Sequence, residues 1–118
     1  MVYKVRVPIY NGILMISINK TTHQAAKDIG CNEIDETDKS HGLFVHHFNG
    51  KDMLYGIIIP EYSIEAHGTI AHECKHFVNR LFDTKGIKLD IENDEAECYL
   101  LKWAVDEVYK AIKKHKIS

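Results

Sequence analysis

The sequence contains only three cysteines, Cys31, Cys74 and Cys98. Their number is odd, and no two of them have the C-x-x-C spacing of a redox motif or a zinc ribbon. A small fold held together by a framework of disulfides is therefore excluded. Unpaired thiols are typical of a reducing compartment, so we expect a cytoplasmic protein.

Long hydrophobic runs are also missing. The most apolar stretches, residues 13–18 and 54–59, are far shorter than the roughly 20 residues that a membrane-spanning helix needs. The beginning of the chain, MVYKVRVPIY, lacks the uninterrupted apolar segment of a signal peptide. We therefore expect a soluble protein that has no membrane partner.

No charge of one sign dominates. The chain has 15 Lys and Arg against 17 Asp and Glu, which gives a formal net charge of -2. This balance gives no sign of a nucleic-acid partner. A helix end explains the basic run near the C-terminus, because cations complement the negative end of a helix dipole. That run consists of Lys110, Lys113, Lys114, His115 and Lys116.

What the chain does have is the composition of an ordinary globular protein, with 45% hydrophobic and 27% charged residues. Its 118 residues suffice for one modest hydrophobic core. Neither an internal repeat nor a low-complexity segment divides the sequence. We therefore expect a single domain over residues 1–118.

Four segments have the apolar pattern of β-strands. Asn11-Gly12 is a strong signal for a hairpin between the first two, and Pro60 ends the last. The expected strands cover residues 2–7, 13–18, 43–48 and 53–59.

Three further segments have helical patterns. The first, residues 21–29, begins with a threonine cap and stops at Gly30. The second repeats its apolar residues every 3.6 positions around residues 70–81 and stops at Gly86. The third runs from near residue 94 to residue 114, with an apolar stripe between Leu101 and Ile112. The order β-β-α-β-β-α-α predicts an α+β fold in which a small sheet packs on helices.

The second helix carries the motif His72-Glu73-Cys74-Lys75-His76, which has the form H-E-x-x-H. Residues four apart on a helix lie one above the other, so both imidazoles can reach one metal ion. With His72 at 0°, His76 falls at about 40° and Glu73 at about 100°, beside apolar residues between about 140° and 240°. Imidazole is a good zinc ligand, and a neighbouring glutamate can take a proton from a water. The motif therefore predicts a zinc site with Glu73 as general base.

A catalytic zinc site has three protein ligands and one open position, so a third ligand is expected downstream. Candidates are dense where the last helix begins, because Asp94, Glu95, Glu97 and Cys98 stand close together there. Glu95 follows His76 with eighteen residues between them. Helical phase is least certain in a first turn, so the pattern alone does not choose among the four.

The segment H-E-C-K-H, followed by N-D-E-A-E-C-Y-L-L-K-W, resembles the small zincin-like metallopeptidases that tailed bacteriophages encode. More distantly it is similar to the family of the repressor-cleaving proteases of mobile elements. The resemblance covers residues 66–105 and extends to the first half only in the order of strands and helices. It implies a minimal zincin-like domain that hydrolyses peptide bonds through a metal-activated water.

Carried over residue by residue, the resemblance implies a gluzincin site that holds Zn²⁺ through His72, His76 and Glu95, with Glu73 as the catalytic carboxylate. The sequence departs from the thermolysin-like pattern at Tyr99, where an aspartate would support a ligand histidine. The implied partners are a peptide or protein substrate and other phage or virion proteins. The implied location is the host cytoplasm or the virion.

Several side chains are candidates for stabilising an oxyanion beside such a site. His46 and His47 are neighbours on an expected strand, so their side chains point to opposite faces and at most one can serve. The candidates are His46, His47, His67, Tyr62 and Tyr99.

Two other functions compete with the peptidase. A non-catalytic binding or assembly module, with a structural or vestigial metal, accounts for the small size of the chain and for Tyr99. A peptide deformylase also uses H-E-x-x-H but needs an upstream cysteine ligand. The upstream cysteine here is Cys31, which follows Gly30 in a polar stretch and fits that role poorly.

Overall fold

Two parallel strands, β2 (Ile13–Ile18) and β4 (Met53–Ile59), form the middle of a four-stranded mixed sheet. β1 (Val2–Arg6) pairs antiparallel with β2, and β3 (Leu43–Phe48) pairs antiparallel with β4, so the strand order is β1-β2-β4-β3. The computed structural model describes residues 2–117. The two edges of the sheet are therefore β1 and β3.

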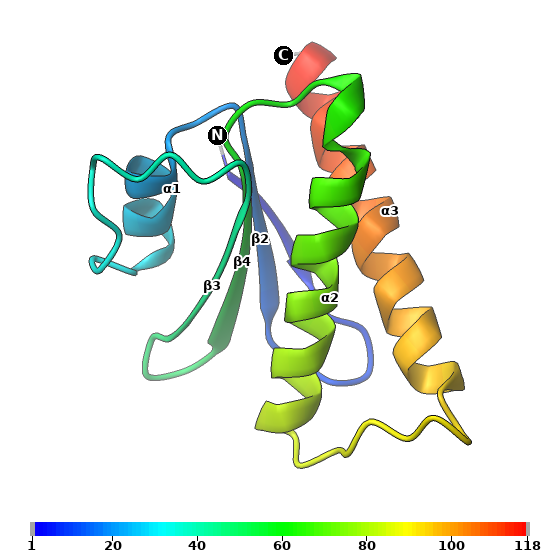
Figure 1. The fold of residues 1–118 in the computed structure, drawn as a ribbon. Coiled ribbons are helices and arrows are strands. Elements are labelled where there is room, and N and C mark those ends of the chain that lie inside the picture. Colours follow the sequence, from blue (N-terminus) through cyan, green and yellow to red (C-terminus); the bar gives the residue numbers. More distant parts are fainter. Residues whose placement is uncertain (1, 118) are drawn as a thin grey trace.

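Helices cover both faces of this sheet (Figure 1). α1 (Thr22–Ile29) lies on one face. α2 (His67–Thr84), which follows a short 3₁₀ turn η1 (Ile64–Ala66), and α3 (Glu95–Ile117) lie on the other face and run antiparallel to each other. α2 packs over β4 and β3, whereas α3 packs over β2. The motif helix thus lies beside the edge strand β3.

Burial on both faces explains why the central strands are almost continuously apolar. Leu14 and Tyr55 face α2 and α3, whereas Met15 and Leu54 belong to the cluster under α1. α1 packs so closely that a β-carbon on Gly56 would lie 2.5 Å from Ile29 Cδ1, so a larger residue there would force the Ile29 side chain to move. The larger cluster joins the sheet to α2 and α3 and forms the main core.

Local signals in the sequence predicted most of the element bounds, but β1 ends one residue earlier than expected and α3 extends three residues further. Thr21 caps α1 by accepting a hydrogen bond from the Gln24 amide at 3.2 Å, and Gly30 ends it in a left-handed conformation. Gly86, with a φ of 70°, follows the end of α2. The hairpin at Asn11-Gly12 is present between β1 and β2. The α+β expectation is confirmed.

The last helix differs from the prediction in its phase. Leu101 and Val105 are only partly buried, whereas Leu100 and Ala111 are buried. The core-facing stripe of α3 is therefore rotated slightly from the expected one, because α3 must contact both α2 and the sheet. Among residues 2–117, no helix combines the length and apolar character that crossing a bilayer requires.

Candidate metal centre

α2 has one face buried in the core and another, exposed face that carries His72 and His76. The predicted apolar face is confirmed, because all of its members are fully buried. His72 and His76 lie on the exposed side of the helix, with the His72 side chain 67% exposed. The buried members are Ile70, Cys74, Phe77, Val78 and Leu81.

The two imidazoles approach each other edge to face. Their Nε2 atoms are 3.1 Å apart, and the ring planes make an angle of 84°. Two nitrogens bound to one tetrahedral zinc at about 2.0–2.1 Å would be about 3.3 Å apart. The two Nε2 atoms lie at hydrogen-bond distance, and this separation is also close to that of two donors that share one metal ion.

Glu73 provides a carboxylate at the same place. Its Oε2 lies 3.9 Å from His72 Nε2, and one ligand atom from each of His72, Glu73 and His76 lies within 4.8 Å of the others. Glu73 is only 6% exposed. Burial raises the pKa of this carboxyl, and the charges of His72 and His76 oppose the rise. The structure thus brings together the three motif residues as a potential metal-binding group.

Gly42, just before β3, lets the chain pass close to this group. A β-carbon there would lie 2.5 Å from Thr69 Cγ2 and 3.1 Å from Glu73 Cγ. Glu73 is therefore held between its own helix and the start of the edge strand. No local sequence pattern indicates this contact, because it joins two segments that are distant along the chain.

We expect Gly42→Ala to destabilise the fold by about 1–3 kcal/mol, because the added methyl group overpacks this contact. Glu73 or the start of β3 must then move, which would disturb the group formed by His72, Glu73 and His76. Gly68→Ala is the control: Gly68 lies in the first turn of α2, and a β-carbon there meets nothing within 4 Å. The urea unfolding midpoint of each variant is compared with that of the wild type: Gly42→Ala should lower it, whereas Gly68→Ala should keep or raise it, because alanine is the better helix former. A wild-type midpoint for Gly42→Ala would contradict the close packing.

The candidates for a third ligand stand apart from this group. Glu95 is the first residue of α3 and is exposed, and it is outside the group of metal-ligating atoms found among residues 2–117. Glu97 instead forms an ion pair with Lys75 of α2. Asp94 and Cys98 are exposed. The assignment of Glu95 as a ligand therefore stays a prediction.

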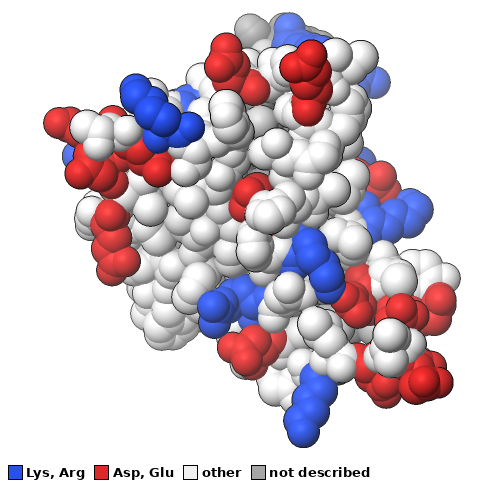
Figure 2. Space-filling view, viewed as in Figure 1, with Lys and Arg blue, Asp and Glu red and all other residues white. Residues whose placement is uncertain are grey.

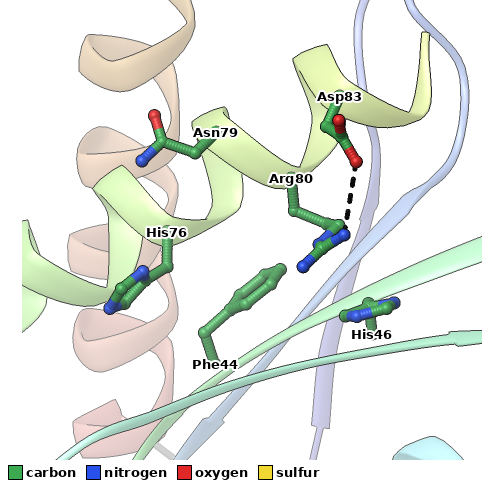
Figure 3. Close-up of a pocket in the computed structure, with 6 residues that line it drawn as sticks. All are labelled: Phe44, His46, His76, Asn79, Arg80 and Asp83. Carbon is green, nitrogen blue, oxygen red and sulfur yellow. Dashed lines mark hydrogen bonds and ion pairs between the residues drawn. The ribbon is translucent and has the colours of Figure 1, made fainter. Parts of the chain in front are cut away.

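A hollow of about 550 Å³ lies next to His76, between α2 and β3. In Figure 3, Arg80 reaches from α2 toward His46 on β3, and Phe44 stands between Arg80 and His76. Sequence reasoning singled out His46 but missed Arg80, although the four-residue spacing from His76 places both on one side of the helix. The hollow is lined by Phe44, His46, His76, Asn79, Arg80 and Asp83.

Comparisons with models of known protein families, with curated proteins and with solved structures found no match to this chain. What the protein does must therefore be inferred from the chemistry of its own residues.

The structure separates the oxyanion candidates. His46 lines the hollow beside His76, whereas His47 packs on Gly30 at the end of α1, so the expectation that their side chains point to opposite faces is confirmed. His67 stacks on Tyr109 with 5.4 Å between ring centroids. Lys116 lies over the Tyr62 ring, and Tyr99 lines an apolar hollow with Pro8 and Trp103. Of the five candidates, His46 is the one that shares the hollow with His76.

Proposed function

We propose that this protein is a zinc-dependent peptidase with a minimal zincin-like fold. The observation that carries the proposal is the 3.1 Å separation of the His72 and His76 Nε2 atoms on the exposed side of α2, with the Glu73 carboxylate in reach of both. Two imidazoles and a glutamate one residue after the first of them are the elements of metal-assisted hydrolysis. We further propose Glu95 as the third protein ligand.

Zinc bound by these histidines would polarise a substrate carbonyl and lower the pKa of a water to about 7. Glu73 accepts the proton from the attacking water and later delivers it to the nitrogen of the leaving amine. The buried position of Glu73 suits this role, because burial alone favours the protonated form and a nearby cation favours the ionised form. Burial thus shifts the pKa of the Glu73 carboxyl upward, in the direction that favours taking up a proton.

The edge strand β3 supports a peptide as substrate. Because β3 is last in the strand order, one side of its backbone has no partner strand within residues 2–117. An extended peptide can add to such an edge through main-chain hydrogen bonds. Much of the surface on this side of the molecule carries no charged side chain (Figure 2), which is compatible with a substrate that is held mainly by its backbone.

The test is zinc-dependent hydrolysis of a mixed peptide library. We expect mass spectrometry to detect products with zinc-loaded protein, to detect none after chelation, and to detect them again when zinc is restored. Glu73→Gln protein purified in the same way controls for a contaminating protease. Hydrolysis that survives chelation, or no hydrolysis by the zinc-loaded protein, would contradict the proposal.

A second candidate is a non-catalytic module in which the metal only stabilises the fold. The separation of Glu95 from the histidines favours it, because two imidazoles and Glu73 then form the whole ligand set. In that case Glu73 binds the metal and is not available as a base. Zinc would raise the melting temperature without giving the protein any peptidase activity.

A further inference from the structure

The hollow beside His76 has a chemistry of its own. Its end nearer to the C-terminus of α2 combines the Arg80 guanidinium with the His46 imidazole, and Phe44 provides an apolar wall toward His76 (Figure 3). The Phe44 and His46 rings are stacked with 6.2 Å between centroids. A group with a negative head and a short aliphatic stem would fit these surroundings.

Arg80 is only weakly engaged by the protein. Its Nη1 contacts Asp83 Oδ2 at 3.3 Å, and the two side chains are 44% and 76% exposed. Such exposed pairs between residues three apart contribute little, and this contact uses one of the five N–H donors of the guanidinium. The charge of Arg80 still lowers the pKa of His46, after the larger effect of partial burial. Asp83 therefore leaves most of the Arg80 N–H donors free to bind another acceptor, although its own carboxylate also lines the hollow.

Arg80 lies on α2, and its position relative to β3 determines which residue of a bound substrate it would contact. β3 and α2 run side by side in the same direction, with Gly42 against Glu73 and His46 close to Arg80. One helical turn from His76 to Arg80 is about 5–6 Å, and an extended chain rises about 3.3 Å per residue. Arg80 is thus one or two substrate residues away from the bond that faces the histidines.

We propose that Arg80, assisted by His46, forms a subsite for a carboxylate of the substrate, one or two residues from the scissile bond toward the C-terminal end of α2. A guanidinium binds a carboxylate through two parallel hydrogen bonds, and the aliphatic stem of the bound residue packs on Phe44. The carboxylate belongs either to an acidic side chain or to the C-terminus of the peptide. This inference rests on the proposed peptidase function.

The experiment uses peptide pairs that differ in one carboxylate. One series exchanges Glu for Gln at each position within three residues of the scissile bond, and a second exchanges a free C-terminus for an amide. We expect one carboxylate to raise kcat/KM about 10- to 100-fold, as charge-assisted hydrogen bonds do. Arg80→Gln should abolish this preference while neutral peptides are still cleaved, and Arg80→Lys should keep part of it.

Arg6→Gln is the matched control, because Arg6 lies at the end of the opposite edge strand β1 and pairs with Asp52 at 3.5 Å. It should keep the full preference. Absence of any preference in the wild-type protein, or a preference that persists in Arg80→Gln, overturns the subsite even though hydrolysis is observed. The series that shows the preference identifies the side chain or the C-terminus as the source.

Binding to the Glu73→Gln protein separates the subsite from the peptidase function. The Glu73→Gln protein should bind the carboxylate-containing peptide of each pair more tightly than its neutral counterpart. This difference in dissociation constant should disappear when Arg80→Gln is added. If this preference is present and no peptide is ever cleaved, the subsite stands and the peptidase function falls. If binding is indifferent to the carboxylate, the subsite falls.

Discussion

Replacing His72 by alanine is expected to abolish binding of the zinc ion, about one per chain, that the proposed function requires. The same result is expected for His76→Ala, because each variant leaves a single imidazole on the exposed side of α2. Losing a group that merely supports a ligand costs roughly 10–100-fold in affinity, so losing a ligand should cost more. Elemental analysis after dialysis against zinc-free buffer measures the effect.

His23→Ala is the control for this measurement. His23 lies on α1, on the opposite face of the sheet, where its Nδ1 contacts the Ile34 carbonyl oxygen at 2.6 Å. It should retain the full zinc content. Zinc that remains bound in both His72→Ala and His76→Ala would show that the metal sits elsewhere or binds without specificity.

The same measurement decides the third ligand. If Glu95 completes the site, Glu95→Ala must lower zinc affinity, although Glu95 lies outside the group that the motif residues form. Glu97→Ala is the natural comparison, because it removes a carboxylate that is already paired with Lys75. Equal affinities for wild type and Glu95→Ala would leave the metal with the three motif residues and favour the structural role.

The helix face and the strand bounds could be predicted because they depend on local chemistry. The 3.6-residue period separates His72 and His76 from the buried residues of α2 whatever the rest of the chain does. The strands β2, β3 and β4 have the predicted bounds because Gly, Pro and Asn-Gly mark their ends. The geometry within H-E-x-x-H needs only a helix.

The surroundings of the motif could not be predicted, because they depend on strand pairing across long stretches of sequence. The parallel pairing of β2 with β4 places β3 at the edge, beside α2. This strand arrangement places Gly42 against Glu73 and His46 close to Arg80. Likewise, the position of Glu95 depends on how the connection between α2 and α3 crosses the end of the bundle, and no local pattern specifies that path.

Glu73→Gln should separate metal binding from catalysis. Glutamine has nearly the same shape as glutamate, so it can occupy the space against Gly42, but it cannot accept a proton. We expect zinc content to stay close to that of the wild type and peptide hydrolysis to fall about 100- to 10,000-fold, the usual contribution of a general base. Zinc titration and kcat/KM on one cleaved peptide measure the two effects.

Glu107→Gln is a matched control, because Glu107 is the other buried carboxylate among the described residues, at 5% exposure. It accepts a hydrogen bond from the Tyr3 hydroxyl at 2.9 Å, on the part of α3 that faces β1, so its loss should leave hydrolysis unchanged. If Glu73→Gln instead releases the zinc, Glu73 is a ligand and the metal is structural. If it keeps both zinc and activity, Glu73 is neither base nor ligand. A general base must stay free of the metal, whereas a ligand must bind it. The effect of Glu73→Gln on zinc content and hydrolysis therefore distinguishes a peptidase from a metal-stabilised binding module.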